Sequence, residues 1–166
     1  MENILNKEPV IRVQKKLDEY NKGLKAIVLN SSARTAQEAA ESLNTEVGSI
    51  VKSLLFTTED GFVLCLVSGD KRCSLNKLKK IRNQKDISMA NADQVKEVTG
   101  FTIGGVSPIG HLHEIEIYID NELSRFKSIY AAAGHPNCIF KISFKNLKKI
   151  TNCVIRDIIE WNNQNY

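Results

Sequence analysis

The sequence lacks the features that identify secreted, membrane-spanning and metal-stabilised proteins. Its four cysteines form no Cys-x-x-Cys pair and have no histidines at zinc-site spacing. No apolar run approaches membrane-spanning length, and the first twenty residues carry too many charges for a signal peptide. We therefore expect a cytoplasmic protein with reduced thiols and neither a metal nor a cofactor. At 166 residues, the chain is long enough for one domain with a substantial core.

Acidic residues are also missing from one part of the chain. The net charge of +4 does not by itself indicate a nucleic-acid-binding protein. However, no acidic residue interrupts the basic group formed by Lys71, Arg72, Lys77, Lys79, Lys80, Arg82 and Lys85. A second basic group consists of Lys141, Lys145, Lys148 and Lys149. These groups predict contacts with phosphates, and the alternative is a solvated helix face.

Glycine and proline are concentrated in one stretch, TGFTIGGVSPIGH, from Thr99 to His111. It holds four of the nine glycines and one of the three prolines. Gly110 is followed by histidine, not by Lys-Ser or Lys-Thr, and the glycine spacing does not fit a dinucleotide fingerprint. We interpret the stretch as a stiff loop that offers backbone N–H donors to a ligand. The alternative is a tight connection that only turns the chain.

This stretch resembles the signature of the YbaK/ProX family of trans-editing aminoacyl-tRNA deacylases, which are related to the editing domain of bacterial prolyl-tRNA synthetases. Gly104 to Pro108 matches the Gly-x-x-x-Pro element of the family. Three further blocks match in the family's order: IVKSLLF from Ile50, MANADQVKEVTG from Met89 and SIYAAAGHP from Ser128. The resemblance covers roughly residues 26–150.

Periodicity predicts an α/β (α+β) fold with a mixed, largely antiparallel sheet surrounded by helices. The resemblance implies the same fold, a curved or partly closed YbaK/aminoacyl-tRNA synthetase-associated domain. We expect residues 1–166 to form a single domain, with an N-terminal helix packed on it within residues 1–25 and a frayed tail at 162–166. Thr35 and Glu38 form a capping-box pattern, which predicts the start of a second helix.

The remaining elements are predicted from apolar spacing and turn residues. The first helix is expected over Pro9–Tyr20. Further helices are expected over Leu75–Arg82, Asn91–Val98, Phe144–Ile150 and Val154–Trp161. Strands are expected at Ala26–Leu29 (buried), at Ile50–Thr58 and Phe62–Ser68 (a hairpin), at Glu114–Asp120 (half-exposed), and at Ser128–Ala133 and Cys138–Ile142.

Lys52 is a lone positive charge in an apolar run. Strand alternation places it on one face with Leu54 and Phe56, opposite Val51, Ser53 and Leu55. A lysine there is costly unless it reaches an anion or the rim of the sheet. The resemblance implies that Lys52 engages the terminal nucleotide of the tRNA acceptor end.

The resemblance also implies that the Gly-x-x-x-Pro element, including Gly104, Gly105 and Pro108, holds the aminoacyl group while water attacks the ester. No side-chain nucleophile is evident in the sequence. The further candidates for substrate binding are Thr102, Ser107, Ala132, Gly134 and His135. On this reading the basic residues Lys71, Arg72, Lys77, Lys79 and Lys80 become candidate tRNA contacts.

The three histidines allow few other roles. His111 and His113 could form two ligands of a metal, but no third ligand at a recognisable spacing supports such a site. His135 lies in the turn AAAGHPN, where the family closes its pocket. It could orient water or substrate, and the alternative is an exposed turn histidine.

The sequence departs from the cysteinyl-tRNA-specific branch of the family in two places. Ala132-Ala133-Gly134 replaces a Ser-Gly-Gly-like segment, and Ile139 replaces an acidic residue. The resemblance implies a deacylase for mischarged tRNA. With these departures, we predict that its substrate is tRNA for proline carrying a small non-cognate amino acid, with prolyl-tRNA synthetase as a candidate partner. The alternatives are a non-catalytic tRNA- or synthetase-binding module, and hydrolysis of a small ester or nucleotide conjugate.

Overall fold

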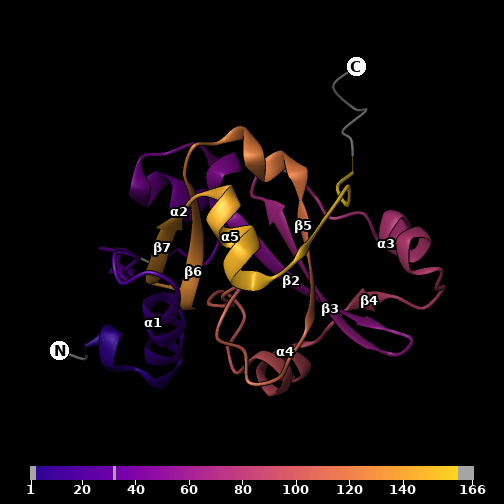
Figure 1. The fold of residues 1–166 in the computed structure, drawn as a ribbon, viewed down its shortest axis with the longest axis horizontal. Coiled ribbons are helices and arrows are strands. Elements are labelled where there is room, and N and C mark those ends of the chain that lie inside the picture. The colour runs from indigo at the N-terminus through magenta and orange to yellow at the C-terminus, as the bar shows by residue number, and fades with distance from the viewer. Residues whose placement is uncertain (1–2, 32, 161–166) are drawn as a thin grey trace.

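The computed structural model describes residues 3–31 and 33–160 (Figure 1). Its α-helices are α1 (Glu8–Tyr20), α2 (Ala36–Leu43), α3 (Leu75–Arg82), α4 (Ala92–Thr99) and α5 (Phe144–Thr151). Its strands are β1 (Ile27–Val28), β2 (Val51–Thr58), β3 (Gly61–Ser68), β4 (Ser88–Met89), β5 (Glu116–Asp120), β6 (Ile129–His135), β7 (Cys138–Ile142) and β8 (Val154–Arg156). Short 3-10 helices lie at Ile4–Asn6, Val47–Ser49 and Asn121–Arg125.

The strands form two sheets, one antiparallel and one mixed. One has the order β1-β7-β6 and the other has the order β4-β2-β3-β5-β8. The pairs β1·β7, β7·β6, β2·β3 and β2·β4 are antiparallel, whereas β3·β5 and β5·β8 are parallel. A single parallel bridge between Ile50 and Tyr130 joins the sheets where β2 begins. This confirms the predicted α/β architecture with a mixed, largely antiparallel sheet.

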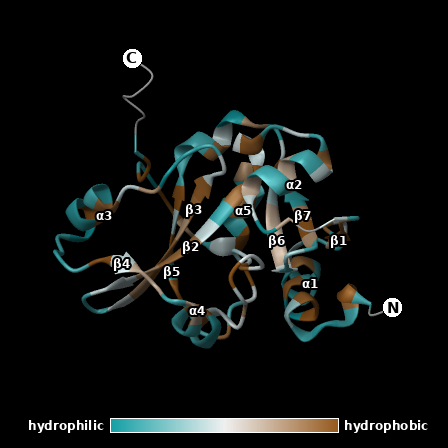
Figure 2. Cartoon of the chain, turned by 180° about the vertical axis from the view of Figure 1, so that it is seen from behind, coloured by the Kyte–Doolittle hydropathy of each residue, from teal (hydrophilic) through white to brown (hydrophobic). Residues whose placement is uncertain are grey.

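The central strand β3 is apolar on both of its faces. Leu64 and Leu66 belong to the main hydrophobic cluster, to which α1, α4 and α5 also contribute. Val63 and Cys65 point to the opposite face and belong to a second cluster beneath α3. Because β3 lies between β2 and β5 and is covered on both sides, its sequence is a continuous apolar run. Figure 2 shows hydrophobic residues along these central strands and hydrophilic residues over α3.

Local capping signals define the helix ends. The side chain of Thr35 accepts a hydrogen bond from the Glu38 amide, and Glu38 completes the predicted capping box of α2. Helices α2, α3 and α5 end at Asn44, Asn83 and Asn152, each in the left-handed conformation with φ of 53°, 52° and 52°. Asparagine tolerates this conformation better than other side chains, so it stops these helices. The helices predicted from Pro9, Leu75, Asn91 and Phe144 are confirmed to within two residues.

The predicted helix over Val154–Trp161 is wrong for the residues that the structure describes, Val154 to Glu160. Asn152 ends α5, and Val154–Arg156 then form β8, which pairs in parallel with β5. β-Branched residues favour that pairing. Further along, Ile159 forms an isolated antiparallel β-bridge with Cys73. Trp161 and the predicted tail at 162–166 lie outside the described residues.

Two predicted exposures are also wrong. The strand β1 was expected to be buried, but it is a short edge strand in which Ile27 and Val28 are both exposed. The alternating sequence before Asp120 was expected to form a half-exposed strand. Instead, Ile117, Tyr118, Ile119 and Asp120 are all buried, because β5 lies between β3 and β8.

Asp120 compensates for the burial of its charge with hydrogen bonds. Only 1% of its surface is exposed, and its carboxylate accepts hydrogen bonds from the amides of Glu122 and Ile158. The second bond holds the chain after β8 against the end of β5. A charged residue in an alternating pattern is therefore part of the core here, because backbone donors satisfy it.

Candidate active site

A cavity of about 350 Å³ opens where β2 and β6 diverge after the bridge between Ile50 and Tyr130. One wall comes from β2 and another from β6 and β7. The remaining wall comes from the glycine-rich loop and from the residues that precede α2. Its lining is mostly apolar and includes Ile50, Val51, Ser53, Leu55, Ile103, Val106, Ala131, Ala132 and Ile139.

The cavity borders a free edge of β2. All six residues from Ile50 to Leu55 line it, although alternate side chains point to opposite faces of the strand. On this edge, the carbonyl of Leu55 accepts a hydrogen bond from the amide of Ala90. Backbone groups of an antiparallel strand point to its two edges in alternation, so Val51 and Ser53 also direct theirs to the cavity edge.

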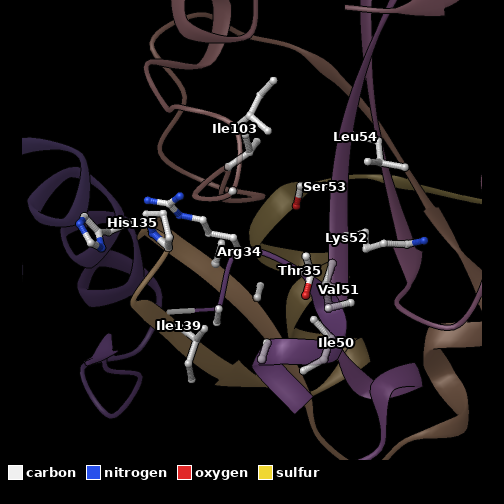
Figure 3. Close-up of a pocket in the computed structure, with 18 of the residues that line it drawn as sticks. Arg34, Thr35, Ile50, Val51, Lys52, Ser53, Leu54, Ile103, His135 and Ile139 are labelled. Atoms are coloured by element: carbon white, nitrogen blue, oxygen red, sulfur yellow. The ribbon is translucent and has the colours of Figure 1, made fainter. Parts of the chain in front are cut away.

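Ser53 brings an unpaired hydroxyl to this apolar wall. Its Oγ atom is buried, and nothing in residues 3–31 and 33–160 hydrogen-bonds to it. Figure 3 shows the oxygen on the same side of β2 as Arg34 and His135. A buried hydroxyl without a partner is unfavourable unless a ligand or water satisfies it. Sequence reasoning did not select Ser53, and the signal was a hydroxyl between the apolar Val51 and Leu55 on one face of the strand.

Lys52 lies at the rim of the same cavity. Its ammonium group donates a hydrogen bond to the carbonyl of Lys71, and Figure 3 shows it on the opposite side of β2 from Ser53. Burial lowers the pKa of Lys52, and the nearby Cys73 and Asp70 partly oppose that effect. The predicted alternation is confirmed, since Leu54 and Phe56 share this side. The ammonium therefore faces the loop before α3, and its role toward a tRNA stays a prediction.

The glycine-rich loop supplies backbone donors, but not through Gly105. The amide of Gly105 donates to the carbonyl of Thr102 at 3.0 Å and so closes a turn. Gly104 and Val106 flank it, and both line the cavity. Within the described residues, no hydrogen bond uses the amide of Gly104 or Val106. These two amides, not that of Gly105, are the candidate donors to a bound group.

Three of the predicted site residues have structural roles in this loop. Ser107 is fully buried, and its Oγ accepts a hydrogen bond from the amide of Ile109 at 3.2 Å. Neither Ser107 nor Pro108 lines the cavity. Thr102 is exposed and contributes its carbonyl to the turn with Gly105. Thr102, Ser107 and Pro108 therefore shape the loop, and the structure does not bring their side chains into the cavity.

Arg12 of α1 holds the far end of the loop. Its Nε atom donates to the carbonyl of Gly110 at 2.5 Å, and its guanidinium carbon lies 4.7 Å from the centre of the Phe101 ring. The Nε2 atom of His111 lies 2.7 Å from the carbonyl of Ser107. Together, Arg12 and His111 fix the loop from outside the cavity. Sequence reasoning missed Arg12, because its loop partners are distant in the chain.

The β6 wall contains Ala132 and His135, and both line the cavity. Gly134 does not line it. With φ of +92°, Gly134 forms part of an irregularity in β6, and a Cβ atom there would lie 2.8 Å from the backbone of Pro9. The Nδ1 atom of His135 accepts a hydrogen bond from the amide of Asn137 at 3.0 Å. In the neutral imidazole the proton is then on Nε2.

The basic group that begins at Lys71 is partly neutralised by residues far along the chain. Lys77 pairs with Asp157 at 2.9 Å, and Arg72 pairs with Glu160 at 3.7 Å. Arg82 pairs with Glu116 and Asp60. Lys71, Lys79 and Lys80 have no carboxylate partner in the described part of the chain. These three are the remaining candidate contacts for an anionic partner.

Two other kinds of feature are absent from the described residues. In residues 3–31 and 33–160, no three histidine, cysteine, aspartate or glutamate side chains are grouped so that they could bind a metal ion. The same residues contain no helix long and apolar enough to cross a membrane. The four cysteines are free thiols, and burial raises the pKa of Cys138 to about 11.

The sequence also matches a known protein family. The model of the aminoacyl-tRNA editing domain matches residues 30–150. The chain belongs to this family, which confirms the predicted resemblance to YbaK/ProX proteins and to the editing domain of prolyl-tRNA synthetase.

Individual relatives support the same assignment. A crystal structure of a proposed trans-editing enzyme for prolyl-tRNA synthetase superimposes with a TM-score of 0.87 and 38% identity, covering 93% of this chain and 99% of that one. The uncharacterised protein YwhH of Bacillus subtilis is 31% identical over 80% of this chain and 85% of its own length. The proline–tRNA ligase of Caldicellulosiruptor saccharolyticus is 35% identical over 64% of this chain, but the match spans only 18% of the ligase.

Proposed function

We propose that the protein hydrolyses the ester bond of mischarged aminoacyl-tRNA as a separate editing enzyme. The observation that carries this proposal is the composition of the cavity. Its apolar walls contain two unused backbone amides, from Gly104 and Val106, together with the unpaired hydroxyl of Ser53. Such a site can enclose a small acyl group and direct donors at its carbonyl oxygen.

The chemistry requires no side-chain nucleophile. Water attacks the ester carbonyl, negative charge develops on its oxygen, and the amides of Gly104 and Val106 stabilise that charge. Donors that are already oriented act strongly in a cavity that excludes water, and each contributes roughly 3 kcal/mol in comparable sites. The hydroxyl of Ser53 is a further donor that can orient the amino acid or the attacking water.

The apolar lining of the cavity favours a small amino acid. Ala131, Ala132 and Ile139 line its β6 and β7 walls and offer no side-chain hydrogen bonds to the acyl group. A pocket of this kind rejects larger side chains mainly by size, with about 10- to 200-fold discrimination for each methylene. One similar structure is described as a proposed trans-editing enzyme for prolyl-tRNA synthetase, and one relative is a proline–tRNA ligase. We therefore propose tRNA for proline carrying a small non-cognate amino acid as the substrate.

The acceptor stem would extend over the basic side of β2. The ammonium of Lys52 faces the loop before α3, near Lys71, and the unpaired Lys79 and Lys80 follow on α3. Such contacts would hold the phosphate backbone without reading its sequence. We further propose that residues 1–166 form one domain that acts in the cytoplasm. Prolyl-tRNA synthetase is the candidate partner that releases the mischarged tRNA.

The proposal is tested by measuring amino acid release from tRNA for proline charged with proline, alanine, serine, cysteine or threonine. We expect the wild type to release at least one small amino acid and to spare proline. Lys52→Ala and Gly105→Ala should each lower kcat/KM at least about tenfold, or roughly 1.4 kcal/mol. Lys15→Ala, which changes an exposed lysine of α1, is the control.

The second candidate is a binding module on the same scaffold. It is favoured by the apolar Ala132 and Ile139, which leave few polar groups around the cavity. Wild-type protein that binds tRNA but releases no amino acid from the full panel would support the module and refute the enzyme. Equal activity of the wild type, Lys52→Ala and Gly105→Ala would remove the proposed site.

A further inference from the structure

Arg34 places an unpaired guanidinium group at the mouth of the cavity. The residue lines the cavity and is exposed to solvent. Its only hydrogen bond in the described part of the chain uses its backbone amide, and its guanidinium forms no ion pair there. Figure 3 shows the side chain extending across the cavity toward His135. An arginine held over a cavity without an anion has five N–H donors available to a ligand.

The nearest acidic residue on the same segment is already engaged. Glu38 uses its Oε1 atom to accept hydrogen bonds from the backbone amides of Arg34 at 3.1 Å and Thr35 at 3.3 Å. This carboxylate caps the start of α2 and does not pair with the guanidinium. The positive charge of Arg34 is therefore not neutralised by its neighbour, and the capping box fixes the backbone from which the side chain extends.

The stem of Arg34 lies against the loop that carries the candidate donors. A Cβ atom on Gly104 would lie 3.7 Å from Cγ of Arg34 and 3.7 Å from Cγ of Pro136. In addition, the amide of Ala33 donates to the carbonyl of Pro136 at 2.9 Å. The start of α2, the glycine loop and the turn after β6 are thus in mutual contact. The stem of Arg34 is therefore in van der Waals range of a side chain placed at Gly104.

The ammonium group of Lys52 does not lie on the side of the cavity where Arg34 lies. Its ammonium binds the carbonyl of Lys71 on the other side of β2. Arg34 is therefore the cationic side chain on the side of the cavity that contains Ser53. An anion that enters together with the acyl group would meet Arg34 first.

We propose that Arg34 binds the last phosphodiester of the tRNA, the one that joins the terminal adenosine to the preceding nucleotide. This inference rests on the proposed function. In an aminoacyl-tRNA the ester and this phosphate are attached to the same ribose, so they lie one sugar apart. With the ester carbonyl at Gly104 and Val106, the adjacent guanidinium is placed for two parallel hydrogen bonds to the phosphate. Arg34 is thus a positioning residue.

Direct binding tests the inference without hydrolysis. The dissociation constants of the dinucleotide CpA and of adenosine are measured by calorimetry or NMR titration for the wild type and for Arg34→Ala. We expect Arg34→Ala to weaken CpA binding about tenfold and to leave adenosine binding within about twofold. Arg34→Lys should recover part of the loss, because it keeps the charge but not the paired geometry. Lys15→Ala again removes one exposed charge and should leave both constants unchanged.

The inference is overturned if Arg34→Ala weakens adenosine and CpA equally, if Lys15→Ala matches its effect on CpA, or if the wild type binds CpA no better than adenosine. In deacylation assays, Arg34→Ala should raise KM about tenfold with little change in kcat. Deacylation with an unchanged CpA constant in Arg34→Ala would refute only the role of Arg34. Arg34-dependent CpA binding without deacylation would refute only the enzyme.

Discussion

Gly105 lies directly against the backbone of His135. A Cβ atom on Gly105 would come within 3.0 Å of both the Cα and the N atom of His135. A side chain at this position would therefore press on the end of β6, and Gly105 is needed for this close contact and not as a donor to a ligand. This contact sets the distance between the amides of Gly104 and Val106 and the β6 wall of the cavity.

The first prediction is that Gly105→Ala displaces the loop. The added methyl group meets backbone atoms that cannot rotate away, so we expect a loss of about 1–3 kcal/mol in the free energy of unfolding and at least tenfold in kcat/KM. Gly61→Ala is the control, because Gly61 has φ of +152° in the β2–β3 turn but nothing within 4 Å of its added Cβ. It should cost stability through backbone strain alone and leave kcat/KM unchanged. Urea unfolding and deacylation assays separate the two effects.

The second prediction concerns two hydroxyls with opposite roles. Ser53→Ala removes a buried hydroxyl that has no partner, so the free energy of unfolding should rise by about 1 kcal/mol. Because that hydroxyl is available to substrate, kcat/KM should fall about tenfold. Ser107→Ala removes a hydroxyl that caps Ile109, and the protein should lose about 1 kcal/mol. If Ser53→Ala lowered stability and left activity intact, its hydroxyl would be structural.

Much of the fold could be predicted from local pattern. The capping box at Thr35, the β2–β3 hairpin and the alternation around Lys52 depend on neighbouring residues, and the structure reproduces them. The glycine loop was recognisable because its composition is unusual. The chain after Asn152 was assigned wrongly, because the spacing of its apolar residues suits a helix as well as the strand that pairs with β5.

The rest of the site depends on contacts between distant segments. Asp157 and Glu160 neutralise part of the basic group, and no local pattern reveals this. Ser53 became a candidate only because its buried hydroxyl lines the cavity and has no partner among the described residues. Likewise, the direction of Arg34 is set by packing against Gly104 and Pro136, which lie about seventy and one hundred residues further along the chain.

The third prediction is a pH dependence of stability due to His111. Burial lowers the pKa of His111, the carbonyl of Ser107 opposes this, and the nearby Arg12 adds to it. As the pH falls below about 6.5, the unfolded chain takes up a proton on this residue before the native protein does. The unfolded state then binds more protons, so stability decreases by up to about 1.4 kcal/mol for each pH unit in that window.

His111→Gln should reduce this acid dependence, since glutamine can donate to Ser107 but does not titrate. The measurement is urea unfolding at intervals between pH 7.5 and pH 5. His113→Gln, which replaces an exposed imidazole, is the matched control. Identical slopes for wild type and His111→Gln would show that other groups cause the acid sensitivity.

The fourth prediction is that Ile139 limits the size of the acyl group. Ile139 and Ile142 are both buried in β7, but only Ile139 lines the cavity. Truncation of either to alanine should cost about 2–4 kcal/mol of stability, because both leave a void in packed surroundings. Only Ile139→Ala should enlarge the cavity.

The ratio of kcat/KM values for a larger and a smaller amino acid on the same tRNA is independent of the folded fraction. We therefore expect this ratio to shift toward the larger amino acid by about tenfold in Ile139→Ala and to remain unchanged in Ile142→Ala. A shift of equal size in both variants would indicate general loosening of the fold, and no shift in either would assign the size limit to another wall.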